Sequence, residues 1–322
     1  LYGVTARPEW LKVRVTGTEG YREILALIGR KSLNTVCQEA RCPNIFDCWG
    51  LERTATFLLM GDVCTRHCGF CAITQGKGRP LDPEEPRHVA EAVAAMNVRH
   101  AVVTSVNRDE LADGGAAHFA ATVREIRVLA PRVTVEVLIP DFLGSEAALR
   151  TVLDERPEVL NHNTETVERL YRRVRPDAVY PRSLELLSRA ARFRNADVRA
   201  AQDGRGGSGG DDPGDSPRDD RPRPPRTMIV KSGLMVGLGE TMDELRRTLG
   251  DLRAAGTDVI TIGQYLQPHA RRLPIEKYYA PEEFDELRRF GDGLGFLHVE
   301  SGPLVRSSYH ARRALSPRKN GR

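Results

Sequence analysis

Short apolar runs and longer amphipathic segments alternate along the chain from residue 55 onward. The apolar runs have the length and composition of strands: Thr56–Met60, His100–Val106, Val133–Ile139, Val159–Asn161, Thr227–Leu234, Asp258–Gln264 and Phe296–Glu300. The segments between them have helical periodicity: Glu85–Met96, Ala116–Leu129, Glu146–Leu153, Thr166–Arg173, Ser183–Phe193, Met242–Ala255 and Pro281–Leu294. Strands that alternate with helices of this length predict a parallel sheet of βα units.

The number of repeats favours an α/β barrel, complete or incomplete, and such barrels place their chemistry at the carboxyl ends of the strands. Polar stretches lie at those ends: Thr104–Asp109, Asp113–Gly115, Asn161–Glu165, Lys231–Thr241 and Gln264–Pro268. Taken singly, each stretch is also compatible with a capped turn, with Asp109 or Thr241 as an ordinary helix cap. His162 has polar neighbours on both sides, so we expect it in an active-site cluster rather than in the core.

Length and charge narrow the class of protein. The 322 residues, with a formal net charge of +4, fit one large α/β barrel or two smaller domains. No apolar run approaches the length of a transmembrane helix, and Leu1–Trp10 lacks the apolar region of a secretory signal. The modest positive charge gives no reason to expect nucleic-acid binding and is compatible with an acidic protein partner. We expect a cytoplasmic protein, or an organellar one if a targeting leader precedes Leu1.

All six cysteines lie in one short region and form two trios. The first trio has the spacing C-x-x-x-x-C-x-x-x-x-x-C and the second C-x-x-x-C-x-x-C: Cys37, Cys42 and Cys48, then Cys64, Cys68 and Cys71. Each trio is one thiolate short of a tetrahedral site. A closed zinc site usually has two C-x-x-C pairs, and disulfides do not suit a chain that looks intracellular. Three thiolates on a short loop suit a [4Fe–4S] cluster with one open iron, while a structural metal site stays the alternative for the first trio.

The second trio, which follows the strand-like Ala55–Met60, resembles the radical S-adenosylmethionine (SAM) superfamily. The resemblance implies a partial (β/α)6 barrel, in which the open iron of the cluster chelates SAM. The run Gly233–Glu240 resembles the superfamily's G-x-I-x-G-x-x-E motif, which helps to hold SAM. By this resemblance and the strand-end positions, the expected SAM contacts are Ser105, Asn163, Glu165, Lys231, Gly233, Gly237 and Glu240.

Two further sequence segments closely resemble those of the lipoyl synthases. They are Asn34–Asn44, which contains Cys37 and Cys42, and Arg306-Ser307-Ser308-Tyr309 near the end of the chain. In that family the first trio binds an auxiliary [4Fe–4S] cluster, and a serine of the R-S-S-Y motif is its fourth ligand. Matched residue by residue, that serine is Ser308, with Ser307 as the alternative. Without the resemblance, both serines would be ordinary polar residues of a tail.

The resemblance implies insertion of two sulfur atoms into an octanoyl chain on a lysine of a carrier domain, at C6 and then C8. Cys64, Cys68 and Cys71 would hold the cluster that cleaves SAM, and the auxiliary cluster would donate sulfur. An unactivated C–H bond has no proton that an acidic or basic side chain can transfer, so a radical from a cofactor is needed. The cofactors implied are two [4Fe–4S] clusters and SAM.

The implied partners are proteins. They are octanoylated carrier domains such as the E2 subunit of 2-oxoacid dehydrogenases and the glycine cleavage H protein, an electron donor such as flavodoxin or ferredoxin, and an Fe–S carrier. Two rival functions stay open at this point. One is sulfur insertion into a small molecule such as dethiobiotin, and the other is cluster carriage or electron transfer without catalysis.

Three regions are expected along the chain. Residues 1–52 form an N-terminal extension with the first trio and an amphipathic helix at Gly20–Arg30, residues 53–300 form the barrel, and residues 301–322 form a tail with the R-S-S-Y motif. The two extensions are expected to cover the auxiliary cluster. Ala201–Arg226 is rich in Gly, Pro, Asp and Arg and cannot build a core, so it is predicted to be a disordered insertion that lipoyl synthases as a family lack.

Overall fold

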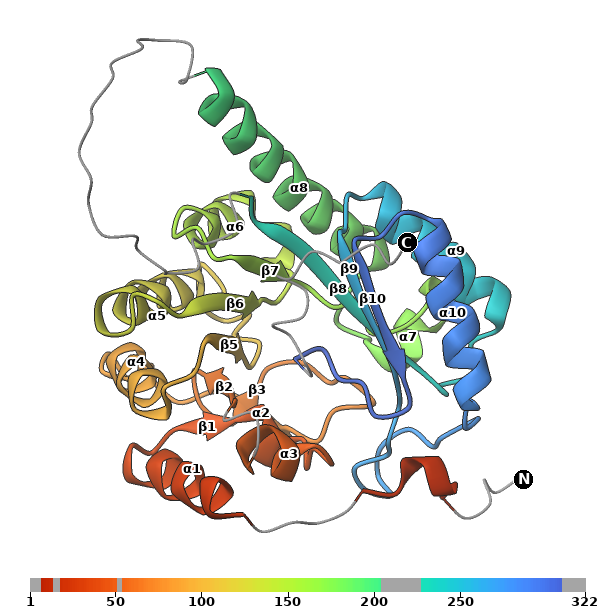
Figure 1. The fold of residues 1–322 in the computed structure, drawn as a ribbon, viewed down its shortest axis with the longest axis horizontal. Coiled ribbons are helices and arrows are strands. Elements are labelled where there is room, and N and C mark those ends of the chain that lie inside the picture. Colours follow the sequence, from red (N-terminus) through yellow and green to blue (C-terminus); the bar gives the residue numbers. More distant parts are fainter. Residues whose placement is uncertain (1–6, 14–17, 51–53, 204–226, 309–322) are drawn as a thin grey trace, which may run out of the picture.

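The computed structural model describes residues 7–13, 18–50, 54–203 and 227–308. Its main sheet has the strand order β1-β2-β5-β6-β7-β8-β9-β10, and all neighbours pair in parallel except β1 and β2 (Figure 1). The strands are β1 (Asn34–Thr35), β2 (Thr56–Leu59), β5 (His100–Ser105), β6 (Thr134–Leu138), β7 (Val159–Asn161), β8 (Ile229–Val236), β9 (Val259–Gln264) and β10 (His298–Gly302). No ladder among the described residues joins the edge strands β1 and β10, so the barrel is open.

One helix of eight or more residues lies between each pair of successive main-sheet strands from β2 to β10. These helices are α4 (Glu85–Met96), α5 (Ala116–Leu129), α6 (Glu146–Leu153), α8 (Tyr180–Asp203), α9 (Met242–Ala254) and α10 (Pro281–Gly293). Figure 1 shows them in an arc around the sheet, from α4 over α8 to α10. Six βα units followed by β10 confirm the expected partial (β/α)6 barrel.

The remaining elements are short or lie in the N-terminal region. They are η1 (Glu9–Leu11), α1 (Glu19–Arg30), α2 (Val36–Glu39), α3 (Ile45–Gly50), β3 (Val63–Cys64), β4 (Thr74–Gln75), η2 (Phe142–Gly144), η3 (Glu168–Leu170) and α7 (Tyr171–Val174). Helix α1 packs against α3 and α4, and β1 extends the main sheet beside β2. The N-terminal extension is therefore built onto the barrel. Its expected boundary with the barrel lies at residues 51–53, outside the described residues.

Burial explains why these segments adopt these structures. Every side chain of β9 is buried, as are most of β5 and β8, because a parallel sheet is covered on both faces. In α4 the predicted apolar face is buried at Val89, Ala92, Val93 and Met96. Thr241 and Glu244 form a capping box at the start of α9, which confirms the ordinary reading of Thr241 as a cap.

Two helices differ from their predicted extent. Thr166–Arg173 is divided between η3 and α7, and the predicted Ser183–Phe193 helix is longer, as α8. Helix α8 includes Ala201–Asp203, so the first three residues of the predicted insertion are helical. The rest of the insertion and Tyr309 of the R-S-S-Y motif lie outside the described residues.

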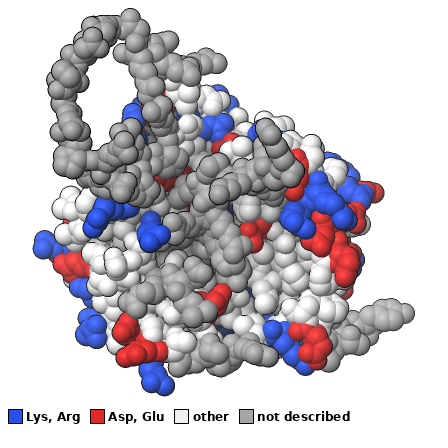
Figure 2. Space-filling model, in the orientation of Figure 1, with Lys and Arg blue, Asp and Glu red and all other residues white. Residues whose placement is uncertain are grey.

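The surface charges and the helices can be compared with what a membrane span requires. Figure 2 shows acidic and basic side chains interspersed over the described part of this face. Within the described ranges, no helix combines the length and the apolar character required to cross a membrane.

Candidate active site

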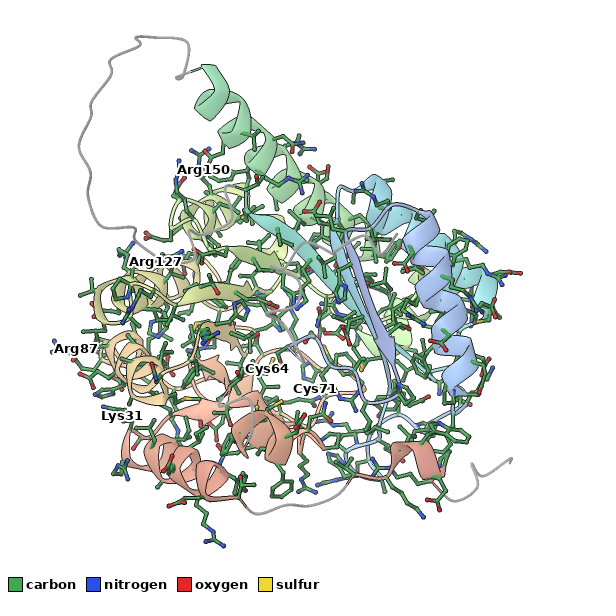
Figure 3. All side chains as sticks on the ribbon, in the orientation of Figure 1. Lys31, Cys64, Cys71, Arg87, Arg127 and Arg150 are labelled. Carbon is green, nitrogen blue, oxygen red and sulfur yellow. The ribbon has the colours of Figure 1, made fainter. Side chains whose placement is uncertain are left out.

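A cavity of about 510 Å³ opens at the carboxyl ends of the strands, and both cysteine trios contribute to its wall. Five cysteines and both serines of the R-S-S-Y motif line it: Cys37, Cys42, Cys64, Cys68, Cys71, Ser307 and Ser308. Cys48 lies in α3 and is not among the lining residues. Figure 3 shows Cys64 and Cys71 near the middle of the molecule. Residues far apart in the sequence thus surround one space.

The six cysteines are all described, and none is in a disulfide. This removes the disulfide alternative for either trio. Among the described residues, no three His, Cys, Asp or Glu side chains are grouped closely enough to hold a single metal ion. In a cubane cluster each thiolate binds a different iron, so its ligands need not converge on one point.

Burial favours the neutral thiol form of several of these cysteines. It raises the pKa of Cys37 to about 11, that of Cys68 to about 11 and that of Cys71 to about 12. Burial also raises the pKa of Cys42, and the nearby Arg306 opposes that rise. Thiols of this kind become thiolates when iron binds, and the soft donor set suits an iron–sulfur cluster.

Backbone groups hold the loop that carries the second trio. The Asn107 N–H donates to Cys64 Sγ at 3.3 Å, and Asn107 O accepts from Thr65 N at 3.1 Å. At the far end of the loop, Gly69 N donates to Val174 O at 2.9 Å. A side chain at Gly69 would clash with Leu273, because its Cβ would lie 2.8 Å from Leu273 Cδ1. The loop is therefore fixed by the ends of β5 and α7.

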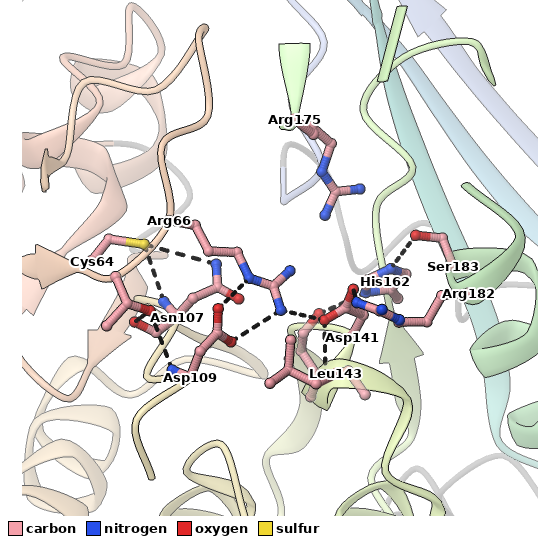
Figure 4. Close-up of polar contacts among 12 residues, drawn as sticks. Cys64, Arg66, Asn107, Asp109, Asp141, Leu143, His162, Arg175, Arg182 and Ser183 are labelled. Carbon is pink, nitrogen blue, oxygen red and sulfur yellow. Dashed lines mark hydrogen bonds and ion pairs between the residues drawn. The ribbon is translucent and has the colours of Figure 1, made fainter. Parts of the chain in front are cut away.

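Arg66, between Cys64 and Cys68, anchors the same loop to two strand ends. Its Nε and Nη2 donate to Asp109 at 2.7 and 3.0 Å, and Nη2 also donates to the buried Asp141 (Figure 4). Burial alone would lower the pKa of Arg66, but the two carboxylates raise it. The buried Nη1 of Arg66 has no partner, and Arg66 lines the cavity. Its N–H groups can donate to an anionic group of a ligand there.

Other unpartnered polar atoms also belong to residues that line the cavity. Ser105 Oγ, Asn163 Oδ1 and Arg175 Nε are buried without a hydrogen-bond partner. Asn163 Nδ2 donates to Glu165 Oε1 at 3.0 Å, and burial raises the pKa of Glu165. Buried polar groups are normally paired, so these atoms fit a polar ligand such as the amino-acid part of SAM.

The expected SAM contacts fall into two groups. Ser105, Asn163, Glu165 and Gly233 line the cavity. A Cβ at Gly233 would lie 2.8 Å from Asn163 Oδ1, so only glycine leaves that wall open.

Lys231, Gly237 and Glu240 are not among the lining residues. Glu240 accepts from the N–H groups of Gly237 and Leu238, and Gly237 has a φ of +102°. These two residues shape the loop after β8. Lys231 is buried and lies 2.9 Å from Glu136 Oε1.

The chain from Pro303 to Ser308, here called the C-terminal segment, crosses from β10 to the first trio. Asn44 Nδ2 donates to Leu304 O at 2.8 Å, and Lys231 Nζ donates to Ser307 O at 2.5 Å. The Thr56 hydroxyl donates to Ser308 Oγ at 2.8 Å. Thr56 also hydrogen-bonds Cys37 through its backbone and side chain, which lowers the pKa of that thiol. Ser308 and Cys37 therefore share Thr56 as a neighbour.

His162 is not in the site, contrary to the expectation from its polar neighbours. Its ring is buried, with Nδ1 2.9 Å from Ile139 O and Nε2 3.0 Å from Ser183 Oγ. Burial lowers its pKa to about 4. Both ring nitrogens have hydrogen-bond partners, and His162 is not among the residues that line the cavity, so it is a core histidine.

Sequence reasoning missed Arg175 and Thr56. Arg175 follows α7, and its Nη1 donates to Asn163 O at 2.8 Å. No local motif marks it, because its role comes from tertiary packing. The sequence places Thr56 only in a strand, and its polar side chain beside an apolar run is the one sign of a functional role.

Comparison with known proteins agrees with this geometry. Residues 58–197 match the family described as the Radical SAM superfamily. Among solved structures, HydG, a maturase of the [FeFe]-hydrogenase, has a TM-score of 0.51 at 13% identity and covers 80% of this chain and 61% of that chain. Methylornithine synthase (PylB) has a TM-score of 0.50 at 13% identity, with 87% and 75% covered. These likenesses show the fold alone.

Sequence relatives are closer. A lipoyl synthase of Rubrobacter xylanophilus is 51% identical over 99% of this chain and 89% of its own length. A lipoyl synthase of Chlorobaculum parvum is 49% identical, with 96% and 95% covered. Similarity at this level over nearly the whole chain, together with the radical SAM match and both cysteine trios, assigns the family. The chain belongs to the lipoyl synthases, within the radical SAM superfamily.

Proposed function

We propose that the two cysteine trios of this chain have separate roles in the reaction. The family activity is a sulfurtransferase reaction that inserts two sulfur atoms, at C6 and C8, into a protein-bound octanoyl-lysine. Its cofactors are SAM and two [4Fe–4S] clusters. In the proposal Cys64, Cys68 and Cys71 hold the cluster that binds SAM. The observation that carries it is the single cavity lined by residues of both trios.

The auxiliary cluster is assigned to the other side of the cavity. In the proposal Cys37, Cys42, Cys48 and Ser308 hold it, with Ser307 as the alternative to Ser308. The bond between Thr56 and Ser308, beside Cys37, favours Ser308. The carbonyl oxygen of Ser307 instead accepts a hydrogen bond from Lys231 Nζ.

When bound, the first cluster and SAM supply a radical that removes hydrogen from carbon, and the auxiliary cluster is the substrate that supplies sulfur. The residues of this chain bind and orient the reactants. Ser105, Asn163, Glu165 and Gly233 are the proposed SAM contacts, since each lines the cavity. Gly237 and Glu240 support them by fixing the loop after β8. The unpartnered Nη1 of Arg66 adds a cation for the SAM carboxylate.

The cavity also has an apolar wall suited to the octanoyl chain. Leu58, Val106, Leu138 and Leu234 line it, and all but Leu138 are nearly inaccessible to solvent. Such a wall binds an alkyl chain by excluding water and keeps water from the reactive carbon. Because residues of both trios line this cavity, a carbon that loses hydrogen on one side can accept sulfur from the other.

The enzyme acts on an octanoylated protein and takes electrons from a donor. We propose carrier domains such as the E2 subunit of 2-oxoacid dehydrogenases and the H protein as substrates, flavodoxin or ferredoxin as the donor, and an Fe–S carrier that rebuilds the auxiliary cluster. A cytoplasmic location, or an organellar one if a leader exists, is likewise proposed. The two rival functions receive no support, since relatives at about 50% identity are lipoyl synthases.

Anaerobic reconstitution tests the division of roles. The protein should bind about eight iron atoms with comparable sulfide, which is the content of two cubanes. With SAM, a reductant and an octanoyl-lysine peptide, it should form 5′-deoxyadenosine and lipoyl product. Replacing Cys64, Cys68 or Cys71 with Ala should abolish SAM cleavage, whereas replacing Cys37, Cys42 or Cys48 should abolish only sulfur insertion. The same phenotype from both trios would contradict the division.

A further inference from the structure

A buried ion pair inside the barrel has no role in the chemistry described so far. Lys231 Nζ on β8 lies 2.9 and 3.2 Å from the two carboxylate oxygens of Glu136 on β6. The exposed fractions of the two side chains are 1% and 0%. Asn161 on β7, the strand between them, donates from Nδ2 to Glu136 Oε1 at 2.9 Å. Burying two charges is costly even when they are paired, so the pair needs a reason beyond stability.

The remaining hydrogen bond of Lys231 leads to the C-terminal segment. Nζ donates to Ser307 O at 2.5 Å, and this carbonyl belongs to the peptide bond that joins Ser307 to Ser308. On the other side, the Thr56 hydroxyl donates to Ser308 Oγ. Strands β8 and β2 thus hold the peptide and the side chain of the same residue from two directions.

We propose that Lys231 is a positioning residue, which fixes Ser308 for the auxiliary cluster by binding the Ser307 carbonyl. The inference rests on the proposed ligand role of Ser308. A serine oxygen is a poor ligand for iron in a sulfur-rich cluster, so its place depends on the backbone that carries it. Glu136 provides the charge that a buried ammonium needs, which one carbonyl oxygen would not supply. This role replaces the SAM contact expected of Lys231.

A pair of substitutions tests the role without leaving a buried charge. Lys231→Met alone would leave Glu136 unpaired, so it is combined with Glu136→Gln, which keeps an acceptor for Asn161. In the folded apoprotein, amide hydrogen exchange over residues 303–308 should become roughly tenfold faster or more, as expected for loss of a charge-assisted hydrogen bond. Circular dichroism and a melting curve confirm that the barrel is intact.

A spectroscopic readout follows Ser308 itself. In a chain whose second trio is replaced by alanine, Mössbauer spectra after reconstitution report the auxiliary cluster alone. The signal of an oxygen-ligated iron should disappear in the double variant, as it should in Ser308→Ala. His100→Gln is the matched control, because His100 Nε2 lies 3.5 Å from Glu136, while its Nδ1 is 2.8 Å from Thr134 Oγ1 and not bonded to the described part of the C-terminal segment. Its exchange and spectra should match those of the wild type.

The outcomes separate the two proposals. A retained oxygen-ligated signal in the folded double variant, while Ser308→Ala loses it, overturns the role of Lys231 alone, whatever the exchange rate. Unchanged exchange in the double variant overturns it as well. A retained signal in Ser308→Ala overturns the ligand role of Ser308, and the role of Lys231 falls with it.

Discussion

One hydroxyl group, that of Thr56, connects the two ends of the chain. It donates to Ser308 Oγ at 2.8 Å, and Thr56 also hydrogen-bonds Cys37. Strand β2 lies between β1 and β5 in the sheet and is buried along its whole length, so the hydroxyl has a fixed position. Thr56 thus places Ser308 beside a thiol of the first trio, where the proposed ligand role requires it.

The weakness of the proposed serine ligand leads to the first prediction. A thiolate binds iron in a sulfur-rich cluster better than a serine oxygen does. Ser308→Cys should therefore retain its auxiliary cluster longer and form lipoyl product roughly tenfold more slowly, which corresponds to about 1.4 kcal/mol in the barrier. Formation of 5′-deoxyadenosine should persist. Both products can be measured in one anaerobic reaction.

Ser307→Ala is the matched control, and it should form both products at wild-type rates. Loss of product from Ser307→Ala with normal product from Ser308→Cys would move the ligand to the neighbouring serine. Wild-type yields from both variants would remove the C-terminal segment from the mechanism.

His162 gives a prediction about stability and pH. Its pKa is lowered from 6.5 to about 4 in the folded protein, so between these pH values the unfolded chain binds more protons. Stability therefore falls as the pH falls through this window. From about pH 7.5 to about pH 5 the loss should be roughly 2 kcal/mol.

His162→Gln cannot titrate, so it should lack this part of the acid dependence. Urea unfolding of the apoprotein at the two pH values, compared between wild type and variant, isolates the effect. An equal pH dependence in both proteins would refute a shifted histidine.

The cysteines and His162 show what the sequence can predict at this scale. The cysteines were found because their spacing is local and their chemistry narrow. His162 was misjudged, since its sequence neighbours are polar while its spatial neighbours are Ile139 O and Ser183. Local sequence does not reveal to which side of a strand end a side chain turns.

At the scale of elements, the C-terminal segment depends on a glycine of β9. A Cβ at Gly263 would lie 2.1 Å from Val305 O, so any side chain there would push the segment off the sheet. The strands and most helices followed from hydrophobic periodicity, whereas this contact did not. It joins residues that are close only after the sheet has formed.

Gly263→Ala should displace the C-terminal segment and cost roughly 1–3 kcal/mol of stability, the usual effect of overpacking. Proteolysis after residue 302 should become faster, and lipoyl product should fall more than 5′-deoxyadenosine does. Gly250→Ala in α9 is the control, because nothing lies within 4 Å of its Cβ and alanine favours the helix. Equal behaviour of the two variants would contradict the packing role of Gly263.

At the scale of the whole molecule, a group of cations lies at the cavity mouth. This cationic rim consists of Arg7, Arg41, Arg271 and Arg272, and His269 lies near the last three. Arg7 and Arg41 line the cavity, and the pKa of His269 is lowered by desolvation and then by the three arginines Arg272, Arg271 and Arg41, so these groups are close together. An octanoyl-lysine must enter past this rim. Carboxylates around that lysine on the carrier would complement it.

Arg41→Glu combined with Arg271→Glu should therefore weaken carrier binding roughly tenfold or more at low salt, with a smaller effect at high salt. SAM cleavage without carrier should be unchanged. Arg132→Glu is the control, because Arg132 is exposed just before β6, at the opposite ends of the strands. Titration of octanoylated carrier at two ionic strengths measures the effect, and equal affinities of all three proteins would exclude the rim as the docking surface.

The meeting of the first trio with the C-terminal segment also sets an order of events during synthesis. Cys64, Cys68 and Cys71 are complete once residue 71 has been made, whereas Ser308 is made much later. The auxiliary cluster can then gain its proposed fourth ligand only after residue 308 has been made. A chain ended after Gly302 should bind iron at the second trio and cleave SAM, yet lack the oxygen-ligated signal of the auxiliary cluster. The order of synthesis would thus delay completion of the auxiliary cluster until the C-terminal segment has joined the wall of the cavity.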